Sequence, residues 1–173
     1  MIYRTPTPMK FRRSPFPLLA VFACISGHAA AATNQYWNIG STGGDGIWGT
    51  GPGDKNWNLA AGAAVGNTTW ADPTDNIAVF QDAVGGTVTV FDPVQTNGLS
   101  QTGANYTLDA GVITLVPGSA AAAPFIQVQS GTLTFKTTLA GSNGLLKTGG
   151  GTLLLANANS YTGPPRSAPV RST

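Results

Sequence analysis

Lys147 and Thr148 stand directly before the glycine run Gly149–Gly151, so this segment has the composition of a phosphate-binding loop. In such a loop the glycines come before the lysine, and a helix follows. Here the glycines come after the lysine and lead into the apolar run Thr152–Leu155. The order therefore predicts a tight corner in which glycine supplies positive φ, with Lys147 as a solvated corner residue.

Aspartates provide two further candidate sites. Asp72 and Asp75 flank a Pro-Thr pair, and paired carboxylates are the groups with which glycosidases cleave polysaccharides. Gly43-Gly-Asp45-Gly is one imperfect copy of a calcium-binding repeat, with Asp54 as a second oxygen donor. Calcium requires several oxygen ligands, and Asp, Gly, Pro and Asn are also the residues that build turns. Turn chemistry is the favoured interpretation of both segments, so no metal is predicted.

Four tryptophans form the last candidate site, and all lie between residues 34 and 80: Trp37, Trp48, Trp57 and Trp70. Such a density of indoles could form a platform on which sugar rings stack. Packing of the same rings in a core or a cap is the favoured alternative. The sequence names these four residues as the candidates for ligand stacking and names no other binding residue.

The N-terminal region has the three parts of a secretory signal peptide. A basic stretch precedes the apolar run Phe16–Ser26, and Ala29–Ala32 offers a cleavage site. The apolar run is too short to span a bilayer. We therefore expect residues 1–32 to direct Sec export and to be removed, so that the mature chain has no membrane-spanning segment.

Removing this signal limits the chemistry that remains. Cys24 and His28 are the only cysteine and the only histidine, and both lie within it. The mature chain also lacks glutamate, so Ser-His-Asp catalysis, Cys-His catalysis and the usual zinc sites are excluded. Its net charge is about −2, without the basic footprint of a nucleic-acid-binding protein. We predict neither catalytic residues nor a cofactor, and no enzymatic activity.

The elements that would position these residues are short strands. No helical periodicity appears after residue 32, and Gly or Pro interrupts almost every stretch of ten residues. In the run Thr87–Phe91, residues 87–90 alternate strictly between polar and apolar side chains, and similar β-rich runs recur to Leu155. An all-β fold follows. A right-handed parallel β-helix is favoured, and an antiparallel β-sandwich is the alternative.

Residues 144–163 carry a more specific signal. Two apolar runs separated by Lys147–Gly151 lead to an Asn-rich turn that ends in Tyr161-Thr-Gly163. This segment closely resembles the autotransporter-associated β-strand repeat of secreted bacterial surface proteins. The Trp-rich opening and the strand Ala78-Val79-Phe80 resemble the segment that often precedes such repeats. The resemblance implies a parallel β-helix in the passenger region of an autotransporter, without a catalytic role.

The predicted organisation places a Trp-rich cap at residues 33–80, a solenoid at 81–163 and a disordered tail at 164–173. The tail contains three prolines and departs from the repeat, which suggests an incomplete passenger. The predicted function is a secreted, adhesin-like structural module on the cell surface, or in the periplasm if no barrel translocates it. The alternatives are a carbohydrate-binding β-sandwich and a polysaccharide-active β-helix enzyme. Partners would be glycans or proteins of a host or cell surface, with self-association through an open solenoid edge.

The final strand of the repeat gives a prediction for individual side chains. Strand side chains alternate with period two, so Leu153 and Leu155 share one face. We expect these two to point into the core, and Thr152 and Leu154 to point outward.

Overall fold

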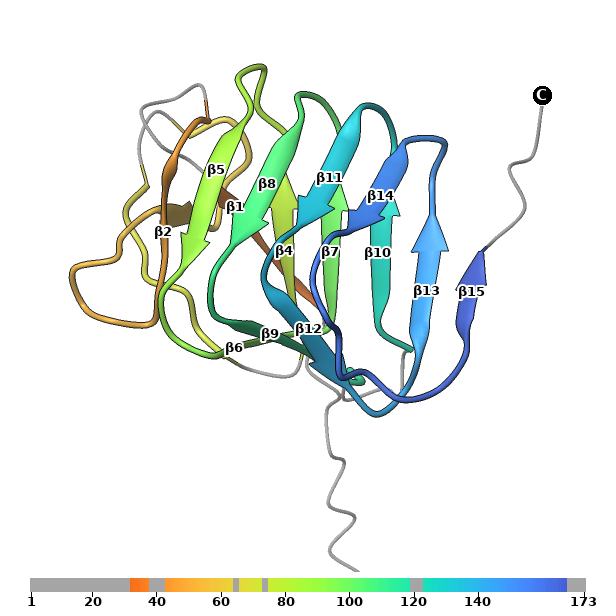
Figure 1. Ribbon diagram of the computed structural model, residues 1–173. Helices are drawn as coiled ribbons and strands as arrows, with labels where there is room; N and C mark the ends of the chain where they lie inside the picture. Colours follow the sequence, from red (N-terminus) through yellow and green to blue (C-terminus); the bar gives the residue numbers. More distant parts are fainter. Residues whose placement is uncertain (1–31, 38–42, 64–65, 73–74, 119–122, 168–173) are drawn as a thin grey trace, which may run out of the picture.

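The computed structural model describes residues 32–37, 43–63, 66–72, 75–118 and 123–167. Within these ranges the chain forms strands and connecting turns, without any helix. The strands, drawn in Figure 1, are β1 (Thr33–Trp37), β2 (Gly46–Trp48), β3 (Trp57–Asn58), β4 (Asn76–Phe80), β5 (Gly86–Val90), β6 (Val94–Thr96), β7 (Gly98–Gln101), β8 (Tyr106–Asp109), β9 (Val112–Leu115), β10 (Phe125–Val128), β11 (Thr132–Phe135), β12 (Thr138–Gly141), β13 (Leu145–Thr148), β14 (Thr152–Leu155) and β15 (Pro165–Ser167).

From β4 onward, successive strands belong to different sheets, and each pairs with its counterpart in a neighbouring coil. The three sheets have the orders β15-β13-β10-β7-β4-β1-β3, β14-β11-β8-β5-β2 and β12-β9-β6. In the seven-stranded sheet, paired residues from β4 to β13 are 21–27 positions apart, whereas those of β1 and β4 are 43 apart. Both separations lie within the range of solenoid repeats. The predicted all-β fold class is confirmed, and its parallel strands in stacked sheets are compatible with a β-helix (Figure 1).

The antiparallel β-sandwich does not describe this chain. Among the named strands only β1 and β3 pair in antiparallel fashion, with Trp37 opposite Trp57. All other strand pairs are parallel, which requires a crossover between partners. Here the strands of the other two sheets provide that crossover.

The core consists of side chains stacked in register from coil to coil. In the seven-stranded sheet Ala78 pairs with Leu99, and Leu99 pairs with Ile126. All three are fully buried. In the five-stranded sheet Leu108 pairs with Phe135, both also fully buried. Each coil buries its apolar face only because another coil lies above or below it.

Sequence alternation determines which residues enter these columns. In β5 the valines Val88 and Val90 are buried, whereas Thr87 and Thr89 are exposed. The same alternation occurs in β11, where Leu133 and Phe135 are buried and Thr134 is only half-buried. A one-residue slip would turn each apolar set toward solvent, so the pattern fixes the register.

Parallel stacking begins at the start of the described chain. β1 pairs with β4, and β2 pairs with β5. The stretch 33–80, expected to be a cap, therefore contains the first coil and the first strand of the second. Coil pairing starts at Thr33 rather than near residue 81.

The C-terminal stretch differs from the predicted disordered tail. β15 pairs in parallel with β13, with Pro165 opposite Leu145 and Ser167 opposite Lys147. Proline lacks the N–H that a central strand requires, but it is tolerated as the first residue of an edge strand. The prediction was wrong for 165–167, and residues 168–173 lie outside the described residues.

The coil above β12 is also partly formed. Ser160 N donates to Leu139 O at 2.9 Å, and Thr162 N donates to Gly141 O at 2.8 Å. Asn159 Oδ1 accepts a hydrogen bond from Leu139 N at 2.9 Å. The Asn-rich turn therefore covers the edge of β12, as an additional strand would.

β14 shows the predicted alternation but incomplete burial. Leu153 and Leu155 are partly buried against the core, and Leu154 is 49% exposed. The predicted inward direction of Leu153 and Leu155 is confirmed. Leu133, the register partner of Leu153 in the preceding coil, is fully buried because it has neighbours on both sides.

Alanine substitutions along β14 should separate the two faces. Leu153→Ala and Leu155→Ala should each lower the free energy of unfolding by about 2 kcal/mol, the low end for a large aliphatic side chain, because burial is partial. Leu154→Ala should change it by about 0.5 kcal/mol or less. Guanidinium chloride unfolding of the full chain measures all three, with Leu133→Ala as the fully buried control. A larger loss for Leu154→Ala than for Leu153→Ala would contradict this strand orientation.

Buried Tyr106 and half-buried Asp82 form a polar pair among the first three coils. Tyr106 Oη donates to Val84 O at 2.9 Å. Burial and the charge of Asp82 raise the pKa of Tyr106 to about 12, although a backbone hydrogen bond with Gly44 acts in the opposite direction. Burial also raises the pKa of the Asp82 carboxyl above its ordinary value of 3.8. Within the described structure Asp82 Oδ2 is buried without a hydrogen-bond partner.

Asp82 should therefore make stability depend on pH in a defined direction. Because its pKa is higher in the folded state, its ionisation costs stability as pH rises from about 3.8 through the folded-state pKa. Asp82→Asn should have little effect below this window and should raise the free energy of unfolding above it. Denaturant unfolding of both proteins between pH 3 and 7 measures the difference, with Asp92→Asn as the control. A stabilising effect that is constant across pH would contradict the assignment.

Candidate functional site

The four tryptophans do not form a ligand platform. Trp37, Trp48 and Trp57 have 0% exposed area, and Trp70 has 2%. Their rings pack against one another, with centroid distances of 5.2 Å for Trp37–Trp57 and 4.9 Å for Trp48–Trp57. No indole face is left for a sugar to stack on. Packing is the role that the structure gives to these residues, because the interior of the first coil must be filled.

This indole cluster closes the interior at the N-terminal end. Trp57 also contacts Trp70, at a centroid distance of 4.7 Å, and Phe80, at 5.6 Å. Trp37 Nε1 donates to Gly44 O at 3.1 Å, whereas Trp48 Nε1 and Trp57 Nε1 are buried without partners in the described structure.

Asp72 has a structural role at a sheet edge. Its Oδ1 accepts hydrogen bonds from Trp70 Nε1 at 2.8 Å and from Gln95 N at 2.9 Å. Gln95 lies in β6, the edge strand of the three-stranded sheet, and its carbonyl accepts a second bond from Trp70 Nε1 at 3.1 Å. Asp72 and Trp70 thus block an edge that would otherwise be open to pairing.

Asp75 and Asp45, which the sequence offered as further site carboxylates, lie in different surroundings. Asp75 is buried, and its carbonyl accepts a hydrogen bond from Thr33 N at 3.1 Å. Asp45 Oδ1 accepts one from Thr87 N at 2.6 Å and so links the first coil to the second. Across the described ranges no group of three or more His, Cys, Asp or Glu residues could hold a metal ion. In the structure, the carboxylates of Asp72 and Asp45 accept hydrogen bonds from backbone amides.

The glycines beside Asp45 serve the turn itself. Gly43 and Gly44 have φ values of 86° and 109°, which favour glycine. A Cβ on Gly43 would stand 2.2 Å from Tyr106 Oη. The segment that resembled part of a calcium repeat is a tight turn packed against a buried tyrosine.

Lys147 was expected to be a solvated corner residue, and that prediction was wrong. It lies within β13 opposite Ile126, in the column that faces the core. Its side chain is half-buried, and Nζ donates to Gly149 O at 2.6 Å and to Thr148 O at 3.3 Å. The ammonium group reaches the carbonyls of the corner while its aliphatic stem covers the last part of the core.

A hollow of about 340 Å³ lies beside Lys147 at the C-terminal end of the stack. Its apolar wall is formed by Leu145, Leu153, Leu155 and Tyr161. Lys147 and Arg166 supply two positive charges at this hollow. Sequence reasoning missed this hollow, because no motif in the sequence marks it.

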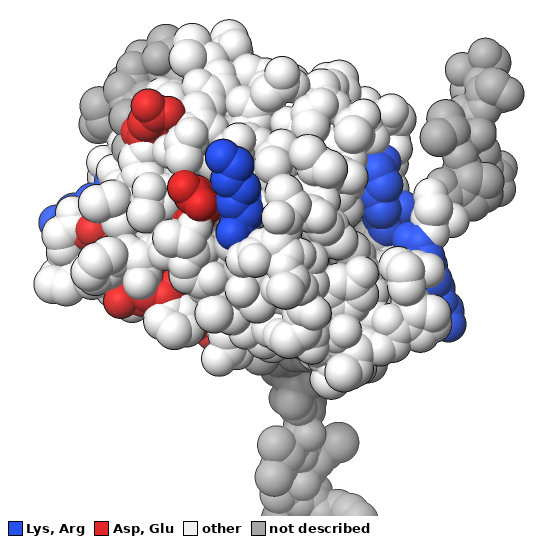
Figure 2. All heavy atoms as spheres, viewed as in Figure 1, with Lys and Arg blue, Asp and Glu red and all other residues white. Residues whose placement is uncertain are grey.

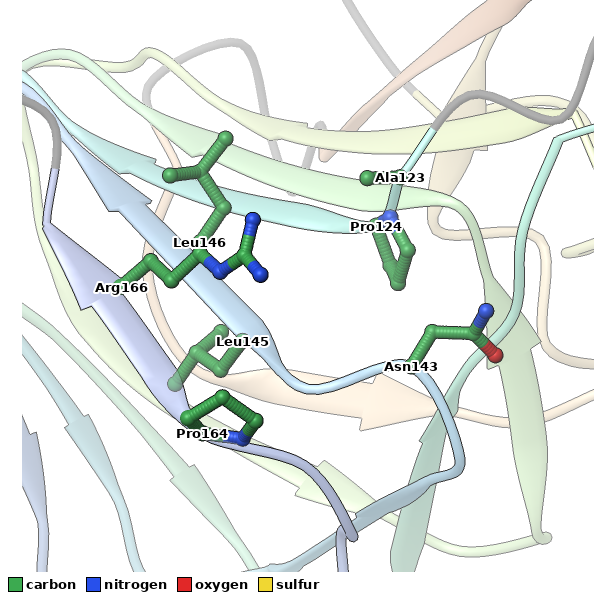
Figure 3. A pocket seen from close by; sticks show the side chains of 7 residues that line it. All are labelled: Ala123, Pro124, Asn143, Leu145, Leu146, Pro164 and Arg166. Atoms are coloured by element: carbon green, nitrogen blue, oxygen red, sulfur yellow. The ribbon is translucent and has the colours of Figure 1, made fainter.

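A second hollow of about 230 Å³ lies close to the first and shares Leu145 and Arg166 with it. Figure 3 shows Leu145, Leu146 and Pro164 on one side, Pro124 and Asn143 on the other, and the Arg166 side chain extending across Leu146. Arg166 is exposed and pairs with Leu146 in the strand register. The C-terminal end of the described surface thus combines two hollows with positive charge.

The described part of the chain contains no helix of sufficient length and apolarity to cross a bilayer.

Comparison with known proteins identifies one informative relative. The chain is 31% identical over 150 residues to "Adhesin BmaC autotransporter" of Brucella suis biovar 1 (strain 1330). The match includes 84% of this chain but only 4% of that much longer protein. No family model matches the chain. No solved structure matches it either.

The aligned part extends well beyond residues 144–163, on which the resemblance to the β-strand repeat was based. Parallel strands in stacked sheets are consistent with a segment of such a passenger region. The chain is therefore homologous to part of an autotransporter adhesin, as the resemblance in its sequence predicted.

Proposed function

We propose that this chain is an adhesive, non-catalytic segment of an autotransporter passenger, displayed at the bacterial cell surface. The observation that carries the proposal is the 31% identity over 84% of the chain to a protein named as an autotransporter adhesin. Because the match spans 4% of that protein, the role of the whole protein reaches this chain only as part of the proposal.

The fold supports a role in surface contact rather than catalysis. Thr87 and Thr89 project from one sheet face, while the interior is filled by packed apolar columns. Of the two carboxylates considered for catalysis, Asp72 already accepts two hydrogen bonds and Asp75 is buried. A long stack of such coils presents a large, rigid surface to a partner. Glycans or proteins of a host or cell surface are the partners we propose.

Export completes the proposal. The basic, apolar and Ala-rich parts of residues 1–32 match a Sec signal peptide. Only an exported chain could meet an extracellular partner. These residues lie outside the described part of the structure, so their support comes from the sequence.

Surface display tests adhesion directly. Bacteria that display the full chain on a translocating barrel should bind host cells or immobilised matrix better than bacteria with the barrel alone. Leu133→Asp places a charge in the core and should abolish binding, because Leu133 is fully buried. Ser130→Asp, at an exposed corner of the same coil, should leave binding unchanged. Flow cytometry with an antibody to an added tag confirms equal display.

The same material discriminates between the alternatives. Polysaccharides incubated with the displayed chain should release no product, and added sugars should not quench tryptophan emission, because the indoles are buried. Product release that depends on Asp72 or Asp75 would support an enzyme. Equal attachment by the Leu133→Asp variant and the parent chain would contradict adhesion by the folded solenoid.

A further inference from the structure

The chain contains two Asn-Gly pairs, and the structure places them in opposite surroundings. They lie in the nearly identical sequences Thr96-Asn-Gly-Leu99 and Ser142-Asn-Gly-Leu145. In such a pair the glycine nitrogen can attack the carboxamide carbon of the asparagine, because glycine has no side chain to hinder the approach. Both pairs are therefore candidates for deamidation, and only the fold can make them differ.

The first pair is held by the coils on both sides of it. Asn97 is 4% exposed, and its Nδ2 donates to Val116 O at 3.0 Å. Its backbone N donates to Asn76 O at 2.9 Å, and its backbone O accepts a hydrogen bond from Phe125 N at 3.2 Å. Attack on its carboxamide requires Asn97 to leave these contacts. We therefore expect this pair to be inert in the folded protein.

The second pair lies at an exposed corner between β12 and β13. The Asn143 side chain is exposed, and its Oδ1 accepts a hydrogen bond from Ser142 Oγ at 2.8 Å, a contact with a chain neighbour rather than with another coil. Gly144 has a φ of 74°, which favours glycine. Figure 3 shows Asn143 on the side of the smaller hollow opposite Arg166. Its carboxamide is therefore open to attack.

Hydrogen bonds to one residue protect the attacking nitrogen of this pair. Gly144 N donates to Thr162 O at 2.7 Å, and Thr162 N donates to Gly141 O at 2.8 Å. Tyr161, beside Thr162, is only partly buried against the core. Gly144 N becomes available when the segment at Thr162 moves away, which is a local opening and does not require the whole chain to unfold.

We propose that Asn143 is a deamidation site of the folded chain, and that the bond between Gly144 N and Thr162 O sets its rate. Gly144 N forms a bond to Asn143 Cγ, and the side-chain nitrogen leaves as ammonia with the proton that Gly144 N gives up. A succinimide ring results. Water then opens the ring at either carbonyl and yields aspartate or isoaspartate. The reaction consumes water alone, and it goes beyond the proposed adhesion without depending on it.

Both products change the surface of this corner. Each replaces a neutral amide with a carboxylate in the hollow that Arg166 also lines, where the two opposite charges attract. Isoaspartate also adds an extra carbon to the backbone directly before β13. Aged and newly made chains should therefore differ at this corner.

Peptide mapping by mass spectrometry tests the proposal on the folded full chain. Cleavage after Lys136 and Lys147 with trypsin releases a peptide in which Asn143 is the only asparagine. During incubation at pH 8 the deamidated form of this peptide should accumulate, whereas a peptide that contains Asn97 should stay unchanged. In guanidinium chloride both pairs should react at similar rates, because the unfolded chain protects neither.

Two variants separate the reacting residue from the segment that protects it. Asn143→Gln should abolish the mass change over the same incubation, because glutamine would have to form a larger ring. Tyr161→Ala should speed the reaction of Asn143 severalfold by loosening the segment at Thr162, and should leave Asn97 unchanged. Phe91→Ala, which removes a side chain that is 72% exposed, is the control and should change neither rate.

Three results would overturn the proposal. Asn143 could stay unmodified in the folded chain although it reacts in denaturant. Asn97 could react as fast as Asn143 in the folded chain, which would show that the fold does not select between the pairs. Tyr161→Ala could leave the rate at Asn143 unchanged, which would show that the segment at Thr162 does not control it.

Discussion

The structure depends on one constraint, which is that a single coil cannot bury its own apolar face. Each coil contributes short strands whose inward side chains need a neighbour above and below. The in-register pairs Ala78–Leu99 and Leu99–Ile126 meet this need, and all three residues are fully buried. Where a neighbour is incomplete, burial falls at once, as it does from Leu133 to Leu153. Stability is therefore a property of adjacent coils rather than of any one of them.

The two ends of the described stack meet this constraint differently. At the N-terminal end four indoles fill the interior, β3 pairs antiparallel with β1, and Asp72 with Trp70 blocks the edge of β6. At the C-terminal end the turn before Thr162 covers β12, and β15 covers β13. The hollow beside β14 is lined in part by the half-buried Leu153 and Leu155. The segments that resembled catalytic or metal sites at the first end are instead the parts that close it.

Local sequence rules predicted the fold class and the alternation within strands. The alternation of Thr87–Val90 and the inward direction of Leu153 and Leu155 follow from period-two patterning, which is a local property. Long-range register could not be read in the same way. Lys147 faces the core column because it pairs with Ile126, and Pro165 forms a strand because β13 offers it an edge. The burial of the tryptophans likewise depends on contacts between segments far apart in the chain. Their spacing in the sequence therefore could not decide between an exposed stacking platform and a buried core. The hollow beside β14 and β15 leaves no motif in the sequence.

Native-state hydrogen exchange, measured amide by amide on the full chain, tests the central claim. That claim is that neighbouring coils stabilise one another and that the tryptophan cluster closes the N-terminal end. Amides of β4, β7 and β8, which lie between other coils, should show the greatest protection. Protection should decline through β11 to β14, and β15 should exchange fastest among the described strands. Uniform protection across all coils, or greater protection in β14 than in β7, would contradict this account.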